Sequence, residues 1–325
     1  MIVVTGAAGF IGSNLVWALN EAGRDDVVVC DWLGKDQRWL NLRKRMFRDF
    51  VFPEDLIEFC RREKPEAILH MGANSSTTAV DGDEILRVNT KFTLALLDYC
   101  AAAGAALIYA SSAATYGAGE NGFVDDDSLA GLKRLRPLNL YGWSKHLVDL
   151  VVAERREKRL ALPPKCVGLK FFNVYGPNEG HKGAMMSVVG KLYQTAAQGG
   201  EVELFKSHRA GVEDGGQRRD FVSVDDVVKT TLWFLDHGPA HGLFNVGTGR
   251  ATTFRAFVEA LFRAIGKPPL IRYVPMPEAL RDRYQYFTEA SLANLRRAGY
   301  AAPFAAVDEG VAAYVGCLSS DDACR

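Results

Sequence analysis

Three glycines close to the N-terminus constrain the fold of this chain more strongly than any other feature. Gly6, Gly9 and Gly12 follow an apolar β-branched run at residues 2–4, and a helical pattern after them stops at Gly23. In this order of strand, turn and helix, the first glycine permits a tight turn, the second lets the backbone approach a pyrophosphate, and the third lets the helix pack on the strand. The N-terminus of the helix then meets the anion. The stretch therefore predicts a dinucleotide site that opens an α/β fold.

An acidic residue completes the dinucleotide pattern. Asp31 ends the next apolar run and stands 19 positions after Gly12, where a carboxylate commonly binds a ribose hydroxyl. Helical and strand-like segments then alternate along the chain. The expected helices are at residues 53–64, 88–103, 141–160 and 253–265, and the expected strands are at residues 67–70, 106–111, 166–172 and 243–249, the last including a turn. This alternation predicts a Rossmann fold, a doubly wound parallel sheet with a smaller C-terminal substrate lobe.

The composition of the chain changes after its middle. Residues 178–216 are rich in Gly, Lys, His and Gln, which favours a separate lobe with mobile loops. We expect residues 209–217 to be its least ordered part, and the polar tail after Gly316 to fray. The expected boundaries assign residues 1–174 and about 220–247 to the dinucleotide-binding domain, and residues 175–219 and about 248–317 to the substrate lobe.

Charge and cysteine usage narrow the class of protein. Lys+Arg and Asp+Glu each number 39, so the net charge gives no reason to expect a nucleic-acid or anionic membrane partner. The six cysteines form no Cys-x-x-Cys pair and the histidines are not grouped, so we expect neither a metal site nor a disulfide framework. There is no apolar run of about 18 residues, and the N-terminus lacks the pattern of a signal peptide. We therefore expect a cytoplasmic protein.

A tyrosine and a lysine one helical turn apart point to proton transfer. Tyr141 and Lys145 share one helix face, and a phenol with a pKa of about 10 needs a nearby positive charge to act as a base at neutral pH. The pattern alone is common and would fit a solvated pair on an ordinary helix. It gains weight from Ser112, which ends the strand expected just before this helix.

Together these residues predict a nicotinamide-dependent enzyme that acts on an alcohol. Tyr141 would remove or return a hydroxyl proton, Lys145 would hold the ribose and lower the tyrosine pKa, and Ser112 would hydrogen-bond to the same oxygen. The doubled arginine at 218–219 is either a solvated face or a clamp for a diphosphate. The residues by themselves do not name the substrate.

A family resemblance supplies a substrate. The stretches that carry it are at residues 4–14, 72–78, 109–117, 137–145, 171–177, 179–183, 219–221 and 244–250. The chain resembles the extended short-chain dehydrogenase/reductase superfamily and, over nearly its whole length, is similar to the ADP-L-glycero-D-manno-heptose 6-epimerase family. The first and fourth stretches mark only the superfamily. The Ser-Ser-Thr-Thr sequence at 75–78 and Glu-Gly-His-Lys-Gly at 179–183 are more particular to the epimerase.

The resemblance implies epimerisation at carbon 6 of an ADP-linked heptose. The carbon would be oxidised to a carbonyl and reduced on its other face, with a tightly bound cofactor and no net redox change. The product would enter lipopolysaccharide core synthesis, and the enzyme would be a homopentamer. Tyr141 and Lys182 would be the two proton-transfer groups. Without the family, Lys182 would be interpreted as a phosphate-binding or surface lysine in a glycine loop.

The resemblance also implies contacts residue by residue. The cofactor would contact Gly6, Gly9, Phe10, Ile11, Gly12, Asp31, Trp32, Arg38, Met71, Gly72, Ala73, Asn74, Ser75, Asn89, Tyr141, Lys145, Val174 and Lys182. The ADP-sugar would contact Ser112, Asn173, Ala184, Lys191, Phe205, Lys206, Ser207, His208, Arg219 and Tyr284. The sequence departs from the family at Ala184 and Lys191, where a serine and a histidine are expected. It also departs at Trp32 and Pro53, where polar or basic cofactor contacts are usual.

The cofactor and two rival functions stay open at this point. Asp31 suits the free 2′-hydroxyl of NAD, whereas Lys35 and Arg38 suit the 2′-phosphate of NADP. Because the family generally carries NADP, we predict NADP, with NAD as the alternative. A UDP-hexose 4-epimerase would keep Ser112 and the Tyr141–Lys145 pair but has no use for Lys182. A catalytically inactive dinucleotide-binding regulatory module is the alternative from another class.

Overall fold

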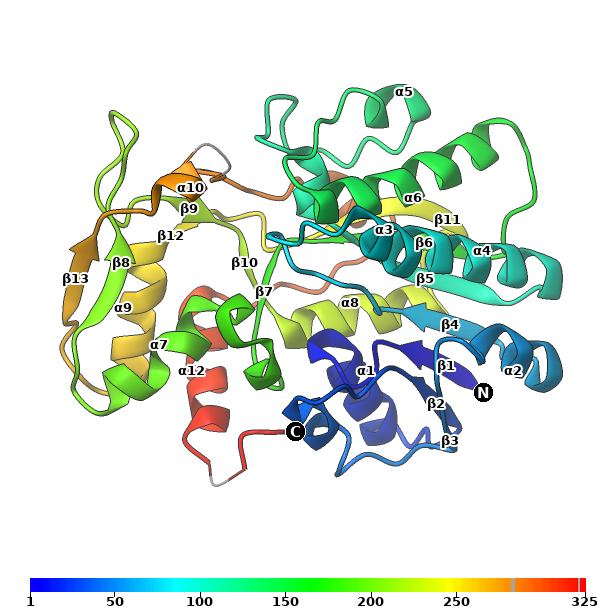
Figure 1. Cartoon of the computed structure of the whole chain (residues 1–325), viewed down its shortest axis with the longest axis horizontal. Helices are drawn as coiled ribbons and strands as arrows, with labels where there is room; N and C mark the ends of the chain where they lie inside the picture. Colours follow the sequence, from blue (N-terminus) through cyan, green and yellow to red (C-terminus); the bar gives the residue numbers. More distant parts are fainter. Residues whose placement is uncertain (282–283, 321) are drawn as a thin grey trace.

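The computed structural model describes residues 1–281, 284–320 and 322–325, and its centre is a seven-stranded parallel sheet (Figure 1). The strand order is β11-β6-β5-β4-β1-β2-β3, with every neighbouring pair parallel. The strands are β1 (Ile2–Thr5), β2 (Val27–Cys30), β3 (Asp49–Val51), β4 (Ala67–His70), β5 (Ala106–Ser112), β6 (Cys166–Phe171) and β11 (His241–Val246). This order is doubly wound, as predicted, and it leaves a crevice at the carboxyl ends of the central strands.

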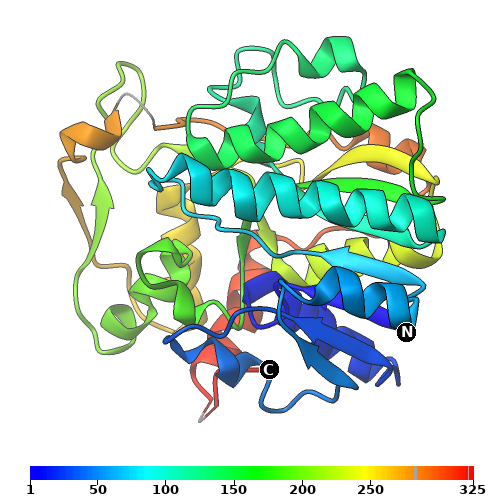
Figure 2. The ribbon, with the colours of Figure 1, turned by 45° about the vertical axis from the view of Figure 1, so that its right-hand side comes forward.

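Helices cover both faces of the sheet, which explains why its strands are apolar without alternation. Val3, Val28 and Ile68 pack with α2 (Leu56–Glu63), α4 (Phe92–Ala103) and α6 (Leu140–Glu157). Val4 and Leu69 face the other side, where they pack with α1 (Phe10–Glu21) and α8 (Val224–Asp236). Figure 2 shows α4 and α6 side by side along one face.

Shorter elements connect the strands and helices of these layers. They are η1 (Gln37–Asn41), α3 (Gly82–Ile85), the π-helical η2 (Leu86–Lys91), η3 (Ala113–Tyr116), α5 (Leu129–Leu132) and α11 (Ala293–Arg297). The predicted helix at 88–103 is therefore a π-helical turn followed by α4. The sequence did not predict β3, whose three residues are too short to show a period.

The smaller C-terminal lobe has a hydrophobic core of its own, which includes Phe257, Leu261 and Val311, and Figure 1 shows this lobe beside the sheet. Its main elements are η4 (Gly180–Met185), α7 (Val188–Ala197), β8 (Val202–Phe205), α9 (Phe254–Ala264), β13 (Ile271–Val274), α10 (Glu278–Arg281) and α12 (Val307–Leu318). The two-stranded pairs β7 (Asn173–Tyr175) with β10 (Phe221–Ser223) and β9 (Arg218–Arg219) with β12 (Thr252–Thr253) join it to the Rossmann core. Phe221 stacks on Phe257 with ring centroids 3.9 Å apart, which anchors the lobe at this junction.

Two segments differ from the expectations for the C-terminal half. Leu295, Tyr300 and Phe304 fall within the range assigned to the substrate lobe, but they pack with α8 against the sheet. The prediction that the tail frays after Gly316 is wrong for the part that the structure describes. α12 continues to Leu318, and Arg325 forms an ion pair with Asp225. Ion pairing with the body of the protein therefore holds a tail whose polar composition suggested fraying.

The remaining predictions of absence concern membranes and metals. Within residues 1–281, 284–320 and 322–325, no helix is long and apolar enough to cross a membrane. The same residues contain no group of three or more His, Cys, Asp or Glu side chains placed to hold a metal ion.

Candidate active site

The glycine turn brings two loops into backbone contact. Gly6 has a φ of +64°, and a Cβ there would lie 2.6 Å from the backbone of Gly72, in the loop after β4. A Cβ on Gly12 would lie 2.1 Å from the carbonyl oxygen of Gly6. Only glycine fits either position. α1 begins at Phe10, three residues before the predicted helix start, so its N-terminal N–H groups point toward the turn. This cradle fits a pyrophosphate.

A cavity of about 780 Å³ opens at the carboxyl ends of the central strands. Every residue predicted to contact the cofactor lines it, with one exception. Asn89 lies behind the wall: its side chain accepts from the Asn74 N–H at 2.8 Å and donates to Ser144 Oγ at 3.0 Å. Ser144 Oγ in turn donates to the carbonyl of Tyr141. Asn89 therefore links the loop after β4 to α6.

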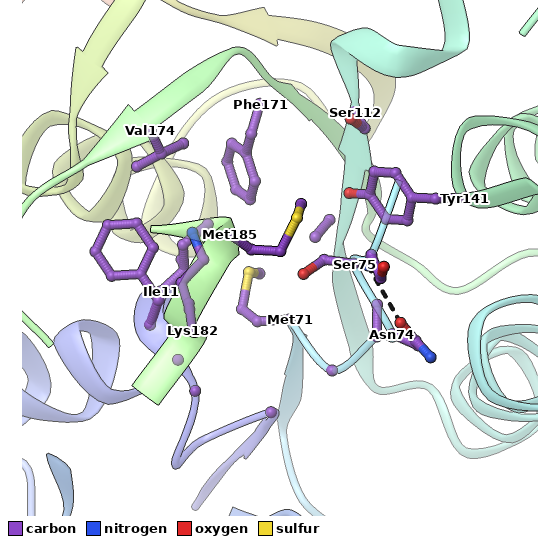
Figure 3. A pocket seen from close by; sticks show the side chains of 18 of the residues that line it. Ile11, Met71, Asn74, Ser75, Ser112, Tyr141, Phe171, Val174, Lys182 and Met185 are labelled. Atoms are coloured by element: carbon purple, nitrogen blue, oxygen red, sulfur yellow. Dashed lines mark hydrogen bonds between the residues drawn. The ribbon is translucent and has the colours of Figure 1, made fainter. Parts of the chain in front are cut away.

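The start of α6 places a tyrosine at the cavity. Asn139 caps the helix by accepting from the Gly142 N–H at 2.8 Å. A Cβ on Gly142 would lie 2.7 Å from the carbonyl oxygen of Ala114, so the helix packs closely on the turn after β5. This contact brings Tyr141 to the same part of the cavity as Ser112, and Figure 3 shows the phenol pointing inward.

Burial dominates the titration of the tyrosine and lysine. It raises the pKa of Tyr141, while the neighbouring Ser112 hydroxyl lowers it. The side chain of Lys145 is only 3% exposed, and burial lowers its pKa to about 8, against the opposing charge of Asp149. Burial thus raises the pKa of the phenol and the Ser112 hydroxyl opposes the rise, while the lowering expected from Lys145 stays a prediction.

Asp31 is turned toward the protein backbone. One carboxylate oxygen accepts from the Ala8 N–H at 2.9 Å and the other from the Trp32 N–H at 2.8 Å. Burial raises the pKa of Asp31, and these two hydrogen bonds oppose the rise. Arg38 Nη1 lies 4.0 Å from the carboxylate, and the same guanidinium is hydrogen-bonded to Asp36. Asp31 and Arg38 therefore line the same end of the cavity, beside the loop that follows β2.

Lys182 approaches from the opposite wall. It belongs to η4, its Nζ lies 3.7 Å from Glu179 Oε2, and it lies 4.8 Å from the centroid of the Phe10 ring. Burial lowers the pKa of Lys182, and the charge of Glu179 opposes the shift. Figure 3 shows Lys182 and Tyr141 on opposite sides of the cavity. Two groups able to exchange protons therefore face one space.

The predicted substrate contacts divide into two sets. Ser112 and Asn173 line the cavity, and the others lie outside its lining. Those others are Ala184, Lys191, Phe205, Lys206, Ser207, His208, Arg219 and Tyr284. Lys191 donates to the carbonyl of Ala184 at 3.1 Å, so these two departures from the family contact each other. The buried guanidinium of Arg219 lies 5.1 Å from the Tyr284 ring centroid.

Part of the cavity lining was not predicted from the sequence. Met185, Met186, Phe221 and Phe254 form apolar lining of the cavity beside the predicted residues, and His181 also lines it. Burial lowers the pKa of His181 to about 4, so it is neutral near pH 7. The signal available in the sequence was the methionine pair directly after the Lys182 loop, which on its own suits any flexible apolar contact.

Comparisons with known proteins agree with this geometry. Residues 2–247 match the model of the NAD dependent epimerase/dehydratase family. The ADP-L-glycero-D-manno-heptose-6-epimerase of Nitratidesulfovibrio vulgaris is 46% identical over 319 residues, covering 97% of both chains. That of Fusobacterium nucleatum is 44% identical over 325 residues, with the same coverage.

Solved structures of sugar-nucleotide epimerases share the fold of this chain. The Helicobacter pylori ADP-L-glycero-D-manno-heptose-6-epimerase superposes with a TM-score of 0.78 at 26% identity, covering 98% of this chain and 96% of that one. A Thermus thermophilus UDP-glucose 4-epimerase in complex with NAD superposes with a TM-score of 0.74, also at 26% identity and with 97% of each chain covered. By sequence over nearly its full length and by fold, the chain belongs to the NAD dependent epimerase/dehydratase family and, within it, to the ADP-L-glycero-D-manno-heptose-6-epimerases.

Proposed function

We propose that this protein interconverts ADP-D-glycero-D-manno-heptose and ADP-L-glycero-D-manno-heptose by transient oxidation at carbon 6, with a tightly bound NADP. The observation that carries the proposal is the pair of proton-transfer groups, Tyr141 and Lys182, on opposite sides of one cavity (Figure 3). Two such groups can exchange protons on the two faces of the carbon whose configuration changes. A dehydrogenase that acts on one face needs only one such group, and a UDP-hexose 4-epimerase has no use for Lys182.

The residues around the cavity divide the chemistry among them. A bound nicotinamide would supply hydride transfer from carbon 6 and back to it. Ser112 Oγ accepts from the Ala114 N–H at 3.1 Å, which leaves its own O–H to donate to the substrate oxygen. Tyr141 exchanges the hydroxyl proton on one face and Lys182 on the other. Lys145 holds the ribose of the cofactor.

The hydrogen bonds of Asp31 support NADP. Both of its carboxylate oxygens already accept backbone N–H groups, so they are less available to a ribose hydroxyl, although Asp31 lines the cavity. Arg38 lines the same end and offers a guanidinium, which binds phosphate oxygens well. Release of the cofactor from purified protein by denaturation, followed by chromatography, identifies it. NADP is the expected result, and NAD alone would contradict this part of the proposal.

The substrate lobe supplies contacts to the ADP-sugar. We assign the diphosphate to Arg219, and the outer part of the nucleotide to the segment that contains Lys206, Ser207 and His208. These contacts lie beyond the cavity that holds Tyr141, as expected for a long substrate whose reacting carbon is at one end. The family resemblance further supports a homopentamer, a cytoplasmic location and a role in lipopolysaccharide core synthesis.

A UDP-hexose 4-epimerase is the second candidate, because a Thermotoga maritima UDP-glucose 4-epimerase with UDP-glucose superposes with a TM-score of 0.73 at 26% identity. One assay separates the two. Purified protein is incubated with ADP-D-glycero-D-manno-heptose without added cofactor, and the carbon-6 configuration is followed by NMR. We expect a mixture of both epimers. Absence of conversion even after addition of NADP, together with turnover of a UDP-hexose, would overturn the heptose assignment.

A further inference from the structure

A fully buried ion pair lies behind the tyrosine wall of the active site. Lys170 on β6 and Asp149 on α6 are both 0% exposed, with Nζ and Oδ2 2.8 Å apart. Among the ion pairs of the described residues, it is the only one in which both side chains are completely buried. Removing two charges from water is costly, and apolar residues often replace such pairs without loss of stability. A contribution to stability is therefore a weak explanation for the presence of this buried ion pair.

Lys170 supports the turn that follows Ser112. Its Nζ donates to Thr115 Oγ1 at 2.5 Å, and Thr115 Oγ1 donates to the carbonyl of Ser112 at 2.8 Å. The same ammonium lies 4.9 Å from the centroid of the Tyr116 ring. The ammonium of Lys170, which has three N–H donors, thus has three neighbours. It donates hydrogen bonds to Asp149 and Thr115 and packs against the ring of Tyr116. A lysine on β6 thereby fixes the backbone of the catalytic serine on β5.

Asp149 supports the helix that carries the tyrosine. It lies one turn beyond Lys145 on α6, and it accepts hydrogen bonds from Ser111 Oγ at 2.7 Å and Tyr109 OH at 3.2 Å, both on β5. These bonds set the position of α6 relative to β5. Because Ser112 belongs to β5 and Tyr141 to α6, one ion pair connects the two segments whose side chains meet at the substrate.

We propose that Lys170 and Asp149 are positioning residues of the reaction, which fix the Ser112 hydroxyl and the Tyr141 phenol relative to each other from behind the cavity wall. The inference rests on the proposed epimerase function for the identity of the substrate. It does not depend on which sugar is bound, because neither residue of the pair lines the active-site cavity.

The pair also sets the charge around Lys145. The titratable groups that face this lysine are Asp149 and Tyr141 on α6 and His70 on β4. Burial lowers the pKa of His70 to about 3, so it is neutral. Asp149 opposes the lowering of the Lys145 pKa by burial. Loss of the carboxylate charge should therefore lower the pKa of Lys145, whereas loss of the Lys170 charge should leave Asp149 unneutralised and raise it.

Three variants test the proposal: Asp149→Asn, Lys170→Met and the double variant. We expect each to lower kcat about 10²-fold, because small displacements of reacting groups have effects of this size, with KM for the ADP-heptose nearly unchanged. The double variant restores charge balance but not the hydrogen bonds, so its kcat should stay low. The matched control is Arg156→Met with Asp127→Asn, which removes an ion pair of α6 far from Tyr141 and should keep the kcat of the unmodified protein.

A measurement without substrate separates failure of this inference from failure of the proposed function. The pKa of Lys145 is followed by NMR of ¹³C-labelled lysine, assigned with Lys145→Met, on samples whose folding is verified by circular dichroism. We expect a lower pKa in Asp149→Asn and a higher one in Lys170→Met. If the pKa of Lys145 shifts in opposite directions in the two variants but the protein does not convert ADP-heptose, the proposed substrate is rejected and the positioning role is retained. Folded variants with an unchanged kcat or an unchanged Lys145 pKa would overturn the positioning role.

Discussion

The two walls of the active site are built in different ways. Tyr141 stands on α6, an 18-residue helix whose Lys145 and Asp149 are buried against the sheet. Lys182 stands on η4, a six-residue 3-10 segment that contains Gly183 with a φ of +52°. Hydrogen bonds between α6 and β5 hold the first wall, while at the second Glu179 accepts from Ser187 and Asn41 donates to the carbonyl of Asn178. We infer that the tyrosine wall is the fixed reference and the lysine wall adapts to the substrate.

Burial acts on both walls in the same physical sense, although the pKa values move in opposite directions. It raises the pKa of Tyr141 and lowers that of Lys182, because a low-dielectric environment disfavours the charged form of each group. The resting pair is therefore shifted toward a neutral phenol, which can donate a proton, and a neutral amine, which can accept one. A pair prepared in this way suits a reaction that moves protons on two faces of one carbon.

We expect the largest loss of activity from a change in the fixed wall, which carries Tyr141. Tyr141→Phe removes the phenolic proton and leaves the ring that packs in the wall, so kcat for epimerisation should fall about 10³-fold or more, within the usual range for general acid–base catalysis. The measurement is the rate of carbon-6 interconversion under saturating ADP-heptose. Trp143→Phe is the control, because Trp143 lies on the same helix but is 40% exposed and outside the cavity lining. Activity close to that of the unmodified protein in Tyr141→Phe would remove the tyrosine from the mechanism.

A substitution in the adaptable wall, which carries Lys182, should lower the activity somewhat less. Lys182→Met keeps an apolar stem beside Phe10 and removes the amine, so we expect a loss in kcat of about 10²-fold. Lys229→Met is a matched control, since Lys229 also lies three residues after its acidic partner, 3.9 Å from Asp226, but on the exposed face of α8. If both lysine variants kept full activity, Lys182 would be a binding residue or a surface lysine, and the comparison of two catalytic walls would fail.

Glu179→Gln sharpens the comparison through pH. Glu179 opposes the burial that lowers the pKa of Lys182, so loss of its charge should lower this pKa further. The limb of the kcat profile that requires a neutral Lys182 should then move to lower pH, because a lost negative charge nearby disfavours the charged form of the lysine. Glutamine can still accept from the Ser187 N–H, which Glu179 Oε2 binds at 2.7 Å. An unchanged limb would show that another group controls it.

The sequence predicted the fixed wall better than the adaptable one. The spacing of the glycines and the four-residue spacing of Tyr141 and Lys145 depend on local geometry. The Rossmann strand order and the proximity of Ser112 to Tyr141 could therefore be predicted directly. The catalytic role of Lys182 could be proposed only from the family resemblance. A glycine-rich loop has no periodic pattern that would tell which way its side chains point. The apolar lining from Met185 and Phe254 comes from elements far apart in the sequence, and only their tertiary packing reveals it. Asn89 was expected to contact the cofactor only through the family resemblance, whereas in the structure it lies behind the cavity wall and hydrogen-bonds to Asn74 and Ser144.

The smallest expected effect is at the cofactor end, far from both proton-transfer groups. Arg38→Ala removes the guanidinium next to Asp31, and we expect protein freed of cofactor to bind NADP about tenfold more weakly, because a hydrogen bond to a charged group contributes about 1.5–3 kcal/mol. Affinity for NAD should change little, since NAD lacks the 2′-phosphate. Arg24→Ala is the control, because its ion pairs with Asp26 and Glu66 lie outside the cavity lining. Equal losses for NADP and NAD would mean that Arg38 shapes the β2 loop through Asp36 and does not select the phosphate.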